Sequence, residues 1–156
     1  MTTRNSPITE PAERVLVITR ILDAPRSLAF KVWTTPEHMM RWLGPRDFTT
    51  TSCKMDFRPG GAYRACIRSP EGQDYWMQGV YREIVEPDRI VFTFAWEDEK
   101  GEPGHETLVT VTFAEHDGKT KLTFHQAVFE SIEDRDSHQE GWTECFDRLE
   151  AYLAGL

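Results

Sequence analysis

The sequence predicts an α+β fold in which seven antiparallel strands pack against one long C-terminal helix. Two patterns support this: a helical apolar stripe closes the chain, and apolar and polar residues alternate through its middle. The length of 156 residues suits one domain that can bury a core without disulfides or metals. We expect residues 1–12 to be a flexible polar tail and residues 13–156 to be the single folded domain.

The first predicted elements are a strand and two short helices. Residues 14–22, RVLVITRIL, are rich in β-branched side chains, which favours a strand. Pro25 suits the first turn of a helix, and a second short helix follows Pro36. Gly44 and Pro45 then end the helical pattern.

Six further strands are predicted from Phe48 onward, where the apolar period changes to alternation. Turn sequences such as Pro59-Gly60-Gly61 and Asp117-Gly118 separate these strands, and antiparallel pairing joins them. We place them near residues 48–57, 61–68, 75–85, 89–97, 106–115 and 120–129.

The C-terminal segment GWTECFDRLEAYLAGL belongs to a helix that begins near Ile132 or Asp136 and ends at Leu153. Its apolar residues recur at spacings of three and four, so they share one side of the helix and need a partner surface. Parity along the strands predicts an aromatic sheet face that can serve as this partner. The stripe comprises Trp142, Cys145, Phe146, Leu149, Tyr152 and Leu153, and the sheet face includes Ile90, Phe92, Phe94, Trp96, Val109, Val111, Phe113, Leu122, Phe124 and Gln126.

The hairpin between the second and third predicted strands has two registers. An even loop places Cys53 opposite Cys66, whereas an odd loop aligns Met55 with Tyr63. Hydrophobic matching favours the odd loop and argues against a Cys53–Cys66 bond. Because Cys145 makes the cysteine count odd and there is no CxxC pair, we expect reduced thiols, no disulfide framework and no zinc site.

Charge and motifs exclude several functions. The formal net charge of −8 argues against nucleic acid and against anionic membrane surfaces as partners. No segment approaches the roughly 18 apolar residues that span a bilayer, and the N-terminus lacks the apolar core of a signal peptide, so we expect a cytoplasmic protein. The histidines show no metal-ligand spacing, and there is no nucleophile elbow or phosphate loop. We therefore predict no catalytic residues, no metal and no cofactor.

Several stretches give the sequence a family resemblance: ITRILDAPRSLAFKVWTTPEHMMRWLGP, DFRPGGAYR, QGVYREIVEPDRIVFTF, ETLVTVTF and GWTECFDRLEAYL. With them the chain resembles the activator of heat-shock-protein-90 ATPase homologue family, which belongs to the START and birch-pollen-allergen-like superfamily. The resemblance implies the helix-grip fold, a curved seven-stranded antiparallel sheet around a long helix. It also implies a cavity between helix and sheet that takes hydrophobic or amphipathic small molecules.

Physical reasoning constrains that cavity. An empty space of about 300 Å³ would cost about 7 kcal/mol at ~24 cal/mol per Å³, which is comparable with the ~5–15 kcal/mol by which whole domains are stable. The space should hold a ligand or water, or be narrowed by large side chains. Core packing or an internal hydrogen bond is the alternative role for each candidate. The candidate ligand-binding residues are Met39, Trp42, Tyr63, Met77, Tyr81, Phe94, Trp96, Phe124, Gln126, Trp142 and Phe146.

Three functions stay open at this point. Non-enzymatic binding of a hydrophobic or amphipathic small molecule is favoured by the architecture and by the missing catalytic set. A chaperone-associated role is the alternative that the family name suggests. A cyclase or hydrolase would need a titratable group inside the cavity, for which Glu83, His125 and Asp56 are the nearest candidates, although parity points His125 outward. A contact with a chaperone or with a second copy of the chain also stays open.

Overall fold

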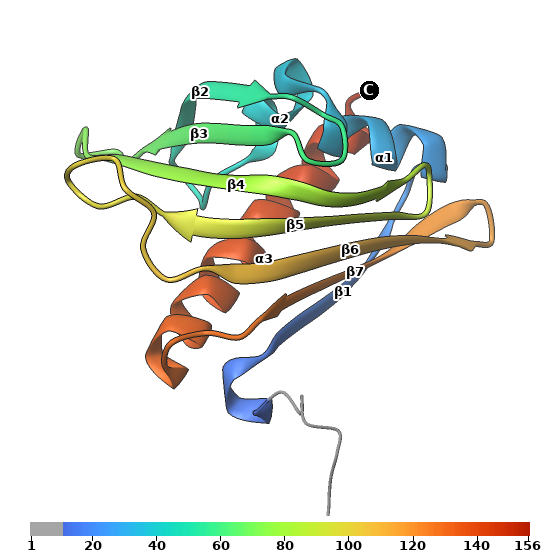
Figure 1. Ribbon diagram of the computed structural model, residues 1–156. Helices are drawn as coiled ribbons and strands as arrows, with labels where there is room; N and C mark the ends of the chain where they lie inside the picture. The colour runs from blue at the N-terminus through green and yellow to red at the C-terminus, as the bar shows by residue number, and fades with distance from the viewer. Residues whose placement is uncertain (1–10) are drawn as a thin grey trace, which may run out of the picture.

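The computed structural model describes residues 11–156 and confirms the predicted α+β fold (Figure 1). Residues 1–10 of the expected tail lie outside the described residues, and residues 12–14 already form a turn of 3-10 helix. The elements are η2 (Ala12–Arg14), β1 (Leu16–Leu22), α1 (Arg26–Thr34), α2 (Pro36–Trp42), β2 (Thr49–Met55), β3 (Ala62–Arg68), β4 (Asp74–Val85), β5 (Arg89–Trp96), β6 (Thr107–His116), β7 (Lys119–Ala127) and α3 (Ile132–Ala154).

The seven strands form one antiparallel sheet in the order β1-β7-β6-β5-β4-β3-β2. The sheet curls around α3, which crosses one of its faces diagonally, while α1 and α2 cover one end (Figure 1). The first strand thus pairs with the last, and β2 forms the opposite edge. This is the helix-grip arrangement expected from the family resemblance.

Strand registers confirm the odd hairpin loop. Cys53 pairs with Ala65 and Met55 with Tyr63, while Cys66 lies opposite Ser52. The register shift between Thr50 and Ser52 precedes these pairs and leaves their alignment intact. Because Cys53 faces Ala65, the two thiols do not meet across the hairpin.

The predicted faces of the sheet and the helix pack together as expected. The helix stripe is buried, except that Tyr152 is only half-buried. Trp96 differs from its neighbours on the sheet face, because 37% of its surface is exposed at the edge of the packed region. In β4 the register shift comes after Tyr81, so Met77 and Tyr81 keep the inward orientation and both are buried.

Aromatic rings form a packed cluster between helix and sheet. Trp33 lies at the centre of this cluster, with its ring centroid 4.8 Å from that of Trp42 and 6.0 Å from that of Phe146. Its ring also stacks on that of Trp142 at 6.4 Å. Large side chains therefore narrow the cavity. This is one of the outcomes expected from the free-energy cost of an empty cavity.

Candidate functional site

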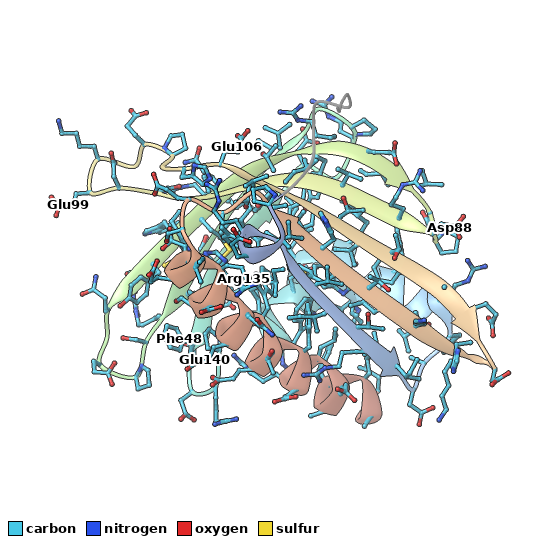
Figure 2. All side chains as sticks on the ribbon, turned by 90° about the horizontal axis from the view of Figure 1, so that it is seen from below. Phe48, Asp88, Glu99, Glu106, Arg135 and Glu140 are labelled. Carbon is cyan, nitrogen blue, oxygen red and sulfur yellow. The ribbon has the colours of Figure 1, made fainter. Side chains whose placement is uncertain are left out.

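A groove of about 370 Å³ opens at one end of the sheet. It lies between α3, the segment after α2 (residues 43–48), and strands β3 to β5. Figure 2 shows Phe48 beside α3 near Glu140, on the side where this groove lies. The segment after α2 contributes Leu43, Gly44, Pro45 and Phe48, and α3 contributes Ser137, His138, Gly141, Trp142 and Cys145. The strands contribute Ile67, Tyr75, Met77, Phe94 and Trp96.

The segment after α2 is held in place as one wall of the groove. Gly44 adopts a φ of 103°, a conformation that favours glycine, and this turns the chain away from the helix. The Arg148 guanidinium on α3 donates hydrogen bonds to the carbonyls of Leu43, Gly44 and Pro45 at 3.3, 2.8 and 3.0 Å. A charged donor shared by three carbonyls fixes this wall against the helix.

His138 and Trp96 form a polar pair at the edge of the groove. The indole N–H of Trp96 donates to Nε2 of His138 at 3.1 Å, so the imidazole carries its own proton on Nδ1. Burial lowers the pKa of His138 to about 4, against a smaller opposing effect of Asp134. The pair is therefore uncharged at neutral pH, and it separates the groove from a neighbouring hollow of about 240 Å³ that His105, Glu130 and Asp134 also line.

A second, inner cavity of about 40 Å³ lies behind the groove and shares four lining residues with it, Leu43, Met77, Phe94 and Trp142. Its remaining lining comes from the core and includes no Asp, Glu, Lys, Arg or His side chain. Burial raises the pKa of the Cys53 thiol to about 11, and it also raises the pKa values of Tyr63 and Tyr81. The inner cavity is thus neutral throughout the physiological range.

The eleven predicted ligand-binding residues fall into three groups. Met77, Phe94, Trp96 and Trp142 line the groove, while Met39, Tyr63 and Tyr81 line the inner cavity. The remaining four line neither space and are completely buried in the core: Trp42, Phe124, Gln126 and Phe146.

The inward polar groups on which the prediction depended are engaged within the protein. Gln126 donates to Thr107 Oγ1 at 2.9 Å and accepts the indole N–H of Trp142 at 3.0 Å. The Tyr63 hydroxyl donates to the carbonyl of Thr93 at 2.7 Å. These bonds are the internal alternative that the sequence left open.

Sequence reasoning missed most of the polar edge of the groove and the whole segment after α2. One signal was available for His138, because it precedes Trp142 by one helical turn and so continues the apolar stripe. No such signal marked Phe48 or Tyr75, whose positions depend on how the strands and the segment meet in space.

The titratable residues that the sequence suggested for catalysis lie outside the groove. Glu83 pairs with Arg89, Asp56 pairs with Arg58 at 2.9 Å, and neither carboxylate lines the groove. His125 lies on the outward parity of β7, opposite Val17 of β1, as predicted. A larger hollow of about 560 Å³ lies on the outer face of the sheet, where exposed charged residues line it.

Residues 11–156 contain no cluster of three or more His, Cys, Asp or Glu side chains that could hold a metal ion. Within the same range, no helix has the length and apolar character needed to cross a membrane.

Comparisons with known proteins agree with this architecture. The family model described as "Activator of Hsp90 ATPase homolog 1-like protein" matches residues 23–154. A solution structure from Arthrobacter aurescens has a TM-score of 0.84 at 24% identity, and the match covers 93% of this chain and 88% of that one. A structure from Rhizobium leguminosarum has a TM-score of 0.79 at 27% identity, over 91% of this chain and 95% of that one. No curated protein matches the sequence.

Proposed function

The chain belongs to the family of Activator of Hsp90 ATPase homolog 1-like proteins, and from this premise we propose that it binds a hydrophobic or amphipathic small molecule in the groove. The observation that carries the proposal is the lining of the groove, where aromatic and aliphatic side chains surround about 370 Å³ with only a few polar groups at one edge. This volume and composition are typical of small-molecule sites.

The chemistry of the groove favours binding without catalysis. His138 is the natural candidate for a base, but its Nε2 accepts the Trp96 N–H and burial lowers its pKa to about 4. Cys145 is the natural candidate for a nucleophile, but burial raises its thiol pKa to about 12. At neutral pH the neutral His138 is only a weak base whose acceptor nitrogen is already engaged, and Cys145 is a thiol rather than the nucleophilic thiolate, so neither group suits efficient acid–base or nucleophilic catalysis.

A thermal-shift screen tests the proposal. Uncharged aromatic and aliphatic compounds are compared with nucleotides and divalent metal ions. A ligand at one hundred times its Kd stabilises the folded state by about 2.7 kcal/mol, which raises the Tm of a domain of this size by roughly 5–10 °C. We expect such shifts only among the apolar compounds, and shifts confined to nucleotides or metals would contradict the proposal.

A pair of tryptophan variants then places the binding site. Trp96 lines the groove, whereas Trp76 lies on the opposite face of β4, where the Arg64 guanidinium covers its ring at 3.8 Å. Trp96→Ala should weaken binding about tenfold, because a bound ring loses one aromatic contact, and Trp76→Ala should leave it unchanged. Equal effects of the two substitutions on ligand titrations, followed by tryptophan fluorescence, would move the site away from the groove.

A further inference from the structure

The indole nitrogen of Trp33 stands out among the buried polar atoms. Within residues 11–156 it is the single fully buried side-chain nitrogen or oxygen that has no hydrogen-bond partner. The other two buried tryptophans donate their N–H groups, Trp42 to the carbonyl of Val32 at 3.1 Å and Trp142 to Gln126. Since a buried indole N–H normally has an acceptor, the N–H of Trp33 points to an acceptor that the protein itself does not supply.

Trp33 lines the inner cavity behind the groove. With about 40 Å³, this cavity exceeds the roughly 10–15 Å³ that one water requires, and it suits a small functional group rather than a ring. A guest in the groove lies on the other side of Met77 and Phe94, which line both spaces. Met77 has a flexible thioether side chain, so it can move aside to admit one end of the guest.

The inner cavity also limits the charge of whatever enters it. No cationic side chain lines it, so a carboxylate or phosphate would lose its hydration without gaining a countercharge. A neutral carbonyl oxygen needs only one good donor, which Trp33 offers. The remaining lining is apolar apart from the Cys53 thiol and the hydroxyls of Tyr63 and Tyr81.

We propose that the ligand of the groove is an uncharged carbonyl compound, a ketone, ester or amide, whose oxygen accepts the N–H of Trp33 in the inner cavity. This inference rests on the proposed function, because it specifies one end of the same guest. It assigns Trp33, the central ring of the aromatic cluster, to ligand recognition.

Three matched probes test the inference on the unmodified protein. They share one naphthalene ring: 2-acetylnaphthalene is the neutral ketone, 2-isopropylnaphthalene is its hydrocarbon isostere, and 2-naphthoate is the anion. Proton–nitrogen spectra resolve the tryptophan N–H groups during each titration. We expect the ketone to move the Trp33 indole proton downfield, the hydrocarbon to bind without this shift, and the anion to bind at least tenfold more weakly than the ketone.

Two variants give an independent readout. Trp33→Phe removes the donor, and it should weaken the ketone about fivefold more than the hydrocarbon, the size of one hydrogen bond. Trp42→Phe is the matched control, because its indole N–H is already bonded to Val32 and it does not line the inner cavity. It should affect both probes equally. If Trp33→Phe fails to fold, the spectra of the unmodified protein decide alone.

The outcomes separate this inference from the proposed function. In one outcome, the probes bind while the Trp33 proton responds alike to ketone and hydrocarbon. In that case the ketone oxygen does not accept the Trp33 N–H, and only the inference is wrong. Stronger binding of the anion than of the ketone also overturns it. If no apolar probe binds at all, the proposed function itself is contradicted, and the inference falls with it.

Discussion

At the scale of single residues, His138 shows how burial sets the charge of the site. Removal from water disfavours the imidazolium form, and the nearby Asp134 carboxylate offsets this only in part. Protonation of Nε2 would in addition displace the N–H of Trp96. Folding and a charged His138 therefore oppose each other.

Stability should fall as the pH drops below about 6.5. The pKa of His138 is about 4 in the folded state, below its unfolded value of 6.5, so the unfolded state binds more protons between these values. The contribution is fully present above pH 6.5 and is lost as the pH falls towards 4, up to about 3 kcal/mol at 1.36 kcal/mol per pKa unit. Urea unfolding between pH 7.5 and 4 measures it.

His138→Gln is the control for this prediction, because its amide oxygen can accept the Trp96 N–H and does not titrate. The variant should lose less stability over this pH range than the unmodified protein, by the amount that His138 contributes. Parallel pH profiles for the two proteins would show that His138 titrates normally in the folded state.

Single polar residues also mark the limit of sequence reasoning. Parity correctly placed Gln126 and Tyr63 on the inner face, but their roles depend on partners that other elements supply. Thr107 lies next to Gln126 and Thr93 next to Tyr63 only once the sheet has formed. A period of two residues gives the direction of a side chain and says nothing of the atom it meets.

At the scale of elements, α3 carries both the core stripe and one side of the groove. The helix begins at Ile132, the earlier of its two predicted starts, because the Ser131 side chain accepts the backbone N–H of Asp134 at 3.1 Å. Gly141 lies inside this helix and lines the groove. A glycine in a helix interior weakens it, and here the missing side chain leaves space for a guest.

Gly141→Ala should therefore stabilise the protein and weaken binding. An added Cβ would meet only Pro45 Cγ at 3.8 Å, an ordinary contact, so the helix gains about 1 kcal/mol from the better helix former. The same methyl group occupies part of the groove and should lower the affinity for 2-acetylnaphthalene severalfold. Urea unfolding and fluorescence titration measure the two effects.

Ala151→Gly on the exposed side of α3 is the matched control. It should lose about 1 kcal/mol through the same helix propensity and leave binding unchanged. If Gly141→Ala binds the probe as tightly as the unmodified protein, the guest does not reach this part of the helix.

The elements themselves were largely predictable. Most strands and helices have an apolar period and a turn signal at their ends, and these local features suffice for type and approximate bounds. In the segment from Leu43 to Phe48, the sequence analysis interpreted Gly44 and Pro45 only as the end of the helical pattern and placed Phe48 at the start of a strand. The position of this segment as a groove wall depends on Arg148, more than one hundred residues later in the chain.

At the scale of the whole molecule, the N-terminal strand β1 contacts the two C-terminal elements, β7 and α3. It pairs with β7, and its Arg20 contacts α3 through Asp147 at 3.0 Å, through Glu150, and through the carbonyl of Thr143 at 3.2 Å. The groove likewise combines α3 with the segment after α2 and with β3 to β5. Its outline follows from this tertiary arrangement, which explains why sequence reasoning found the cavity but not its boundary.

Because one helix spans both halves of the sheet, we expect residues 11–156 to unfold as one cooperative unit. Arg20→Met keeps the aliphatic stem and removes the ion pairs and the hydrogen bond of Arg20 with α3, so it should cost about 1–2 kcal/mol. Tryptophan fluorescence and far-ultraviolet circular dichroism should report the same shifted midpoint. Arg68→Met removes an exposed pair with Asp74 inside one hairpin and should cost well under about 1 kcal/mol. Two separate transitions would instead mean that β2 to β4 unfold independently of β5 to β7, and that the groove lies between two units rather than within one.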